Sequence, residues 1–116
     1  MKYLDGFVLA VPNANREVYR EFAAKAAEML KEHGATRVVE SWGDDVPEGK
    51  RTSFTIATER KEDETAVFSW IEWPSKAVRD VGMKAFMEDP RLRDFPPMPF
   101  DGQRMFFGGF EPLVDV

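Results

Sequence analysis

The chain has 116 residues, a formal net charge of −5 and no cysteine. Its length predicts one domain, residues 1–116, and the lack of cysteine excludes disulfides, thiolate nucleophiles and cysteine-bound zinc or iron–sulfur clusters. Lysine and arginine are interspersed with aspartate and glutamate, so no basic patch for nucleic acid or anionic lipid is expected. The N-terminal run lacks the basic segment and long apolar core of a signal peptide or membrane span, which favours a cytoplasmic protein.

The first part of the chain predicts a strand, a helix and a second strand. Residues 3–12 form the first strand, which Pro12 ends. Asn13 or Asn15 caps the helix that follows, and Gly34 ends it. The inner stripe of this helix is predicted at Val18, Phe22, Ala26, Met29, Leu30 and His33. Residues 36–43 form the second strand.

The second part predicts one more helix between strands. Residues 52–59 are either an extra strand or a continuation of the second one, and we favour a hairpin with the strand at 65–73. Pro74 and Ser75 open a helix that Asp89–Pro90 ends. Its inner stripe is predicted at Val78, Val81, Gly82, Ala85 and Phe86. The proline-rich segment 90–103 should be extended and packed down, ahead of a last strand at 104–111.

This order predicts an α+β fold of the ferredoxin-like βαββαβ type with an elaborated hairpin, in which two helices cover one face of an antiparallel sheet. Residues 7–11, 66–73 and 105–110 are apolar on both faces of their strands. A bare face would instead alternate with polar residues. We therefore expect a second copy to cover that face, giving a sheet-to-sheet homodimer, or dimeric α/β barrel.

Several segments carry a resemblance to a known family. They are residues 3–12 (YLDGFVLAVP), 31–47 (KEHGATRVVESWGDDVP), 67–80 (VFSWIEWPSKAVRD), 89–91 (DPR) and 98–112 (MPFDGQRMFFGGFEP). The chain resembles, over essentially its whole length, the YbaA-like family of small bacterial proteins of unknown function, within the dimeric α/β-barrel superfamily. That resemblance implies a ferredoxin-like subunit paired sheet to sheet. The superfamily includes cofactor-free monooxygenases, isomerases and haem-degrading enzymes, with a pocket between sheet and helices.

Three titratable residues are candidates for catalysis. His33 is either a general acid or base at a pocket mouth or a capping residue at the end of the first helix. If their strands pair, Glu40 and Glu72 would face one another across the sheet, which would raise the proton affinity of one and give a base near neutral pH. Alternatively, each pairs with an arginine such as Arg37 or Arg104.

Aromatic residues are the candidates for a pocket lining. We expect Trp42 and Trp70 on one face of the sheet and Trp73 on the other. A pocket between helices and sheet would be lined by Phe22, Trp42, Phe68, Trp70 and Phe86. The alternative is that these side chains are core and interface anchors. Acidic residues 44, 45 and 48 are expected in a solvated turn, and no metal site is predicted.

These features favour a homodimeric small-molecule-binding protein, with no cofactor and with neither nucleic acid nor membrane as a partner. A cofactor-independent oxygenase or isomerase acting on a small aromatic or lactone-like metabolite would fit the superfamily. The alternative is a noncatalytic structural or interaction module, in which the same aromatic residues are core. RNA binding is a distant third, because the chain is acidic.

Overall fold

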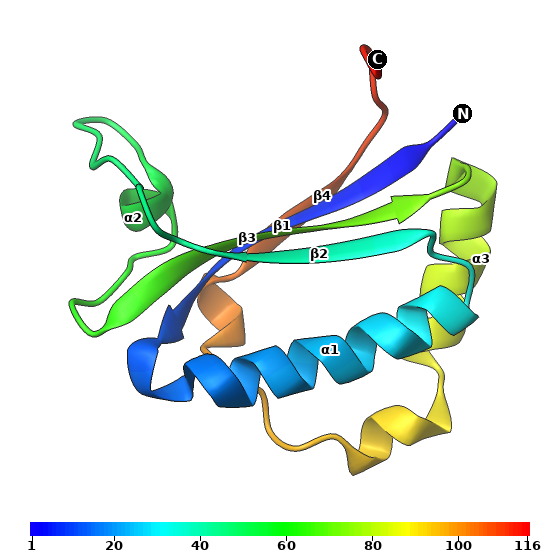
Figure 1. Cartoon of the computed structure of the whole chain (residues 1–116), viewed down its shortest axis with the longest axis horizontal. Coiled ribbons are helices and arrows are strands. Elements are labelled where there is room, and N and C mark those ends of the chain that lie inside the picture. Colours follow the sequence, from blue (N-terminus) through cyan, green and yellow to red (C-terminus); the bar gives the residue numbers. More distant parts are fainter.

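A four-stranded antiparallel sheet with two helices on one face forms the protein in the computed structural model, which describes residues 1–116 (Figure 1). The strands are β1 (Tyr3–Pro12), β2 (Arg37–Trp42), β3 (Glu64–Trp73) and β4 (Phe106–Phe110), in the order β2-β3-β1-β4. The helices are α1 (Arg16–Glu32), the short α2 (Phe54–Ala57) and α3 (Lys76–Met87), with 3-10 turns η1 (Asn13–Asn15), η2 (Pro90–Asp94) and η3 (Gly102–Arg104). The predicted α+β, ferredoxin-like fold is confirmed.

Helix α1 turns a different residue inward at its start than the sequence pattern predicted. Val18 is 50% exposed, whereas Tyr19 is 7% exposed and packs with Leu9 and Val11 in the core. Tyr19 takes the inner position because its ring packs in the core while its hydroxyl donates a hydrogen bond to Glu40 on β2. The helix ends as predicted at Gly34, whose φ of 114° favours glycine.

Helix α3 likewise presents a different stripe. Ser75 caps it, its side chain accepting a hydrogen bond from the Val78 amide at 3.1 Å. Val81, predicted to face inward, is 73% exposed. Gly82 faces inward because the fully buried Trp73 ring lies against it, where an added Cβ would come within 2.6 Å of that ring.

The predicted strand at residues 52–59 is wrong, because part of this segment forms α2. The Ser53 hydroxyl accepts from the Ile56 amide at 3.1 Å, and the Thr58 hydroxyl donates to the Phe54 carbonyl at 2.7 Å. Such local bonds compete with strand pairing. The excursion between β2 and β3 therefore elaborates the hairpin without adding a strand, and it rises on the side of the sheet opposite α1 (Figure 1).

The segment between α3 and β4 packs down as expected but is not wholly extended. Phe95 and Phe100 lie edge-on to Phe22, with ring centroids 5.4 and 6.4 Å away. The turns η2 and η3 interrupt the predicted extended backbone, each capped by an aspartate at its start. The segment thus closes the side of α1 that faces away from the sheet (Figure 1).

The two faces of the sheet differ in what covers them. The helix side carries buried residues such as Leu9, Val67 and Ile71. The other face is also apolar, but its aromatic side chains are uncovered: Phe68 is 46%, Phe106 43% and Phe110 59% exposed. The predicted two-faced apolar character of the strands is therefore confirmed.

Candidate ligand-binding cleft

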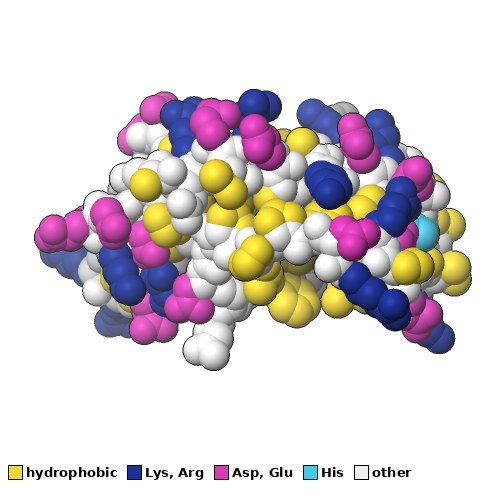
Figure 2. Space-filling view, turned by 90° about the horizontal axis from the view of Figure 1, so that it is seen from below, with side chains coloured by type: hydrophobic (Ala, Val, Ile, Leu, Met, Phe, Trp, Pro, Cys, Tyr) yellow, Lys and Arg dark blue, Asp and Glu magenta, His cyan; other side chains and the backbone are white.

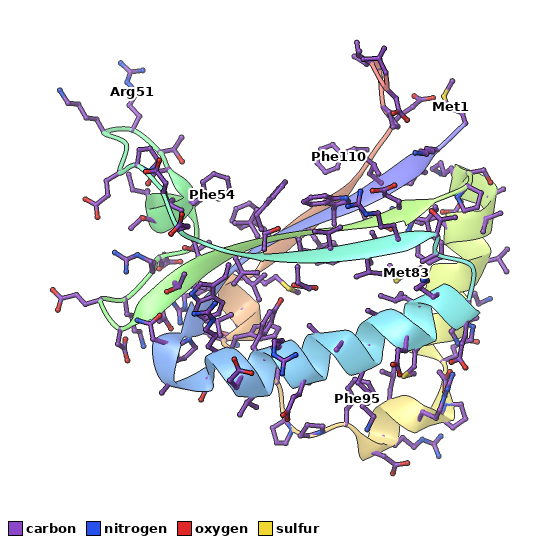
Figure 3. The ribbon with its side chains drawn as sticks, viewed as in Figure 1. Met1, Arg51, Phe54, Met83, Phe95 and Phe110 are labelled. Carbon is purple, nitrogen blue, oxygen red and sulfur yellow. The ribbon has the colours of Figure 1, made fainter.

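A cleft of about 540 Å³ lies between the helix side of the sheet and the inner faces of α1 and α3. Most of its wall is apolar, including Leu9, Phe22, Met83 and Phe86. Met83, labelled in Figure 3, lies between the sheet and α1. From the helix side, Figure 2 shows apolar side chains gathered through the middle of the molecule and charged ones at its two ends and along its upper edge. The volume and lining suit a small, mainly apolar ligand.

Glu40 and Tyr19 form the polar pair of the cleft that is best placed for chemistry. The Tyr19 hydroxyl donates to Glu40 Oε1 at 2.5 Å. Glu40 is an exposed residue on the edge strand β2, and its side chain lines the cleft. Desolvation of its carboxylate by the surrounding protein atoms raises the pKa of Glu40 above its ordinary value, and the Tyr19 hydrogen bond only partly opposes it. Burial and the Glu40 charge raise the pKa of Tyr19 far above its usual range, so the phenol stays protonated.

Ser69 lies beside this pair on the same face. In the sheet register, Ser69 of β3 is opposite Glu40 of β2 and opposite Phe7 of β1. Its side chain is on the cleft wall, and the residue is only 4% exposed. The hydroxyl can donate a hydrogen bond to a ligand oxygen next to the carboxylate of Glu40.

Asp5 and Arg79 form a second polar pair in the cleft, and both side chains already have hydrogen-bond partners within the protein. Asp5 is 5% exposed and accepts from Arg79 Nη2 at 2.9 Å and from Trp73 Nε1 at 2.9 Å. Arg79 Nη1 also donates to Asp80 at 2.8 Å. Gly109 of β4 leaves the space for the guanidinium, because an added Cβ would collide with Arg79 Nη2. The arrangement is structural, since each partner compensates the charge of the other.

The predicted aromatic lining is only partly brought together. Phe22 and Phe86 line the cleft as expected. Trp42 lies on the same face but borders an adjoining hollow at the edge of the sheet. The prediction that Phe68 and Trp70 line the cleft is wrong. Both side chains are on the uncovered face of the sheet. Trp42 consequently shares its face with Trp73 and not with Trp70.

The expected pairing of Glu40 with Glu72 is also wrong. Glu72 is opposite Arg37 in the register and is on the uncovered face of the sheet. It accepts from Trp70 Nε1 at 3.0 Å and lies 3.5 Å from Arg37 Nη1. The alternative that Glu72 pairs with an arginine is the arrangement present. Arg104, the other arginine considered, pairs with Glu64 instead.

His33 caps the end of α1 and does not line the cleft. Its Nε2 lies 2.9 Å from Asp89 Oδ2 at the end of α3. Arg91 and then His33 hold the pKa of Asp89 well below its usual range. His33 therefore joins the ends of two helices, in keeping with the capping interpretation.

Sequence reasoning missed Asp5, Tyr19, Ser69 and Arg79. A charged or hydroxyl side chain within an otherwise apolar strand, as at Asp5 and Ser69, was the available signal. Elsewhere, no group of three or more histidine, aspartate and glutamate side chains is arranged to hold a metal ion. No helix combines the length and apolar character needed to cross a bilayer.

The chain was compared with known proteins. Residues 2–102 match the family model described as "Protein of unknown function (DUF1428)". The uncharacterized protein YbaA of Escherichia coli K12 is 56% identical over 116 residues, covering 99% of each chain, and that of Shigella flexneri is equally similar. A dimeric ferredoxin-like protein from an uncultured marine organism has a similar structure, with a TM-score of 0.62, 14% identity and coverage of 99% and 98% of the two chains.

SnoaB, a cofactor-independent oxygenase from Streptomyces nogalater, is also similar in structure, here in a mutant form. The TM-score is 0.58 with 13% identity, over 99% of this chain and 96% of SnoaB. At this identity the likeness shows the fold alone. The family match and the full-length similarity to YbaA show that the chain belongs to the DUF1428 family of proteins of unknown function.

Proposed function

We propose that the protein binds a small aromatic or lactone-like metabolite in the cleft and that Glu40 accepts a proton from it. The observation that carries this proposal is a carboxylate of raised pKa in a mainly apolar cleft, with a neutral phenol as its hydrogen-bond partner. Proton transfer to a positioned carboxylate is most effective when its pKa is near the working pH. The reaction class is that of a cofactor-independent isomerase or oxygenase.

Each residue of the pair has a distinct role. Tyr19 binds Glu40 Oε1, which leaves Oε2 to take a proton from an acidic C–H or O–H of the substrate. In an isomerase the same oxygen returns the proton to another carbon, whereas in an oxygenase the resulting anion reacts with O₂. Ser69 would stabilise the oxygen on which negative charge develops. SnoaB, which has a similar fold, is a cofactor-independent oxygenase, so this fold is compatible with such chemistry.

A metabolite screen by thermal shift tests the binding part of the proposal. A ligand at a hundred times its dissociation constant should add about 2.7 kcal/mol to the free energy of unfolding. Glu40→Gln should retain the shift and lose turnover, because the amide can still accept from Tyr19 but cannot take the proton. Glu72→Gln, on the opposite face, is the matched control and should leave both unchanged. Full turnover by Glu40→Gln would reject the assignment, and no shift from any metabolite would favour the noncatalytic alternative.

We also propose that the uncovered sheet face packs against the same face of a second copy. The support is the exposed aromatic side chains of that face, Phe68, Phe106 and Phe110, and the dimeric state of the ferredoxin-like protein of similar structure. Exposed apolar patches of this kind mark interfaces. Ultracentrifugation at micromolar concentration should find dimers, and single chains alone would contradict the pairing.

A further inference from the structure

A second hollow adjoins the cleft at the edge of the sheet. It measures about 350 Å³ and lies between α1 and β2. Its wall shares with the main cleft the residues Tyr19, Ala23, Ala27, Val38 and Glu40. Because β2 is an edge strand, this hollow opens beside Glu40. The two spaces therefore adjoin at this shared wall.

The second hollow contains an arginine without a carboxylate partner, whereas Arg79 in the main cleft is paired with Asp5. Arg20 is engaged, since its Nε donates to Glu17 at 2.8 Å. Arg16 forms no ion pair, and its guanidinium carbon lies 5.3 Å from the centroid of the Trp42 ring. Contact with an aromatic face leaves the in-plane N–H groups of a guanidinium free to bind an oxyanion. In a chain of net charge −5, Arg16 is thus a local cation beside an apolar cleft.

We infer that the ligand is an organic anion whose apolar body fills the cleft and whose carboxylate, sulfonate or phosphate lies in the second hollow against Arg16. This inference rests on the proposed function and specifies its substrate class. The reacting part of the ligand would lie by Glu40 and Ser69, where the two spaces meet. The anionic group would lie one α1 turn away, at the solvent side, where Arg16 compensates its charge.

Two fluorescent probes of nearly the same shape test the inference. They are 1-anilinonaphthalene-8-sulfonate and N-phenyl-1-naphthylamine, which lacks the sulfonate. Arg16→Gln should weaken the sulfonate probe about three- to fivefold, as expected for one exposed ion pair, and leave the neutral probe unchanged. Raising the salt concentration should weaken only the sulfonate probe. Arg16→Lys should recover part of the loss.

Lys25→Gln is the matched control for the charge. Lys25 is on the same helix and also lies over an aromatic ring, with Nζ 4.9 Å from the centroid of Phe95, but it lines neither space. Its loss should not change the affinity of either probe. Equal weakening by Arg16→Gln and Lys25→Gln would show a general effect of net charge and overturn the inference.

A blocking variant separates failure of this inference from failure of the proposed function. Ala27 is in the wall shared by both spaces, so Ala27→Trp should abolish binding of both probes. If that variant does not fold, Ala27→Leu gives a smaller obstruction. If the Ala27 variants still bind the probes with unchanged affinity, the probes bind elsewhere on the protein, and the cleft loses its support as a binding site. Binding that Ala27 variants block but Arg16→Gln does not affect would overturn only the anionic substrate class.

Discussion

Replacing Glu64 by glutamine should reduce stability at neutral pH, and the effect should fade in acid. The carboxylate is 4% exposed and makes a bidentate ion pair with Arg104, with two N–O distances of 2.7 Å. This pair ties the start of β3 to η3, just before β4. The hydrogen bond from Arg104, assisted by the Lys61 amide, lowers the pKa of Glu64 from 4.5 to about 2.

The sign of the pH dependence follows from that shift. A carboxyl whose pKa is lower in the folded than in the unfolded state stabilises the fold above the unfolded pKa of 4.5 and loses this contribution as pH falls towards about 2. The full shift corresponds to about 3 kcal/mol. Because glutamine can still accept a hydrogen bond from Arg104, and Asp101 remains to pair with the guanidinium, we expect Glu64→Gln to cost about 1–2 kcal/mol.

Urea unfolding of the wild type and Glu64→Gln between pH 7 and pH 2.5 measures this contribution. The gap in the free energy of unfolding should be largest above pH 5 and shrink in acid. Glu62→Gln is the control, because Glu62 is exposed and makes no ion pair with either Arg104 or Lys61. A gap that stays constant or widens as the pH falls would refute the assignment of the stabilisation to this pair.

Three further variants test the cleft and the uncovered sheet face. Gly109→Ala should cost about 1–3 kcal/mol in thermal or urea unfolding, because its Cβ collides with the fixed Arg79 guanidinium. Phe110→Glu should weaken the proposed dimer by about 100-fold in ultracentrifugation, since a charge replaces an apolar side chain in both copies. Tyr19→Phe should raise the pKa of Glu40 further in a ¹³C NMR titration, because the hydrogen bond that lowers it is lost.

Neighbouring residues provide controls for these variants. Gly108→Ala should be nearly neutral, since its Cβ would meet the Phe110 ring at an ordinary 3.5 Å. Phe107→Glu should leave the dimer intact, because Phe107 is on the helix side of the same strand. Tyr3→Phe should not move the pKa of Glu40. An unchanged pKa in Tyr19→Phe would show that the short contact to Glu40 does not persist in solution.

The sequence predicted the order of elements and the uncovered apolar face because both depend on local patterns. The apolar runs of β1 and β3 and the capping residues Ser75 and Gly34 each act within a few neighbours. The prediction of a strand at 52–59 is wrong because local interactions also decided the structure there. Its apolar residues fit a strand, but Ser53 and Thr58 bind the local backbone more favourably.

Phe22, Phe86 and Glu40 were predicted as site residues, but the rest of the site could not be predicted because it depends on the register between β2 and β3. A tight turn would have fixed the register and therefore which residues share a face. The connection from residue 43 to 63 is a long excursion instead, and it does not determine the register of β2 against β3. A shift by one residue would turn Glu40 to the other face. The inner position of Tyr19 has the same origin, since its hydroxyl is satisfied only when Glu40 faces the helices.

The same face of the sheet carries two carboxylates, and their surroundings give them different roles. Asp5 is on the central strand β1, where Arg79 compensates its charge and Trp73 fixes its orientation. Glu40 is on the edge strand β2, where a neutral phenol is its only side-chain partner and desolvation raises its pKa. A base needs both an uncompensated carboxylate and a route for its proton to reach solvent. Only the edge strand offers both, which is why we propose the chemistry for Glu40 and a structural role for Asp5.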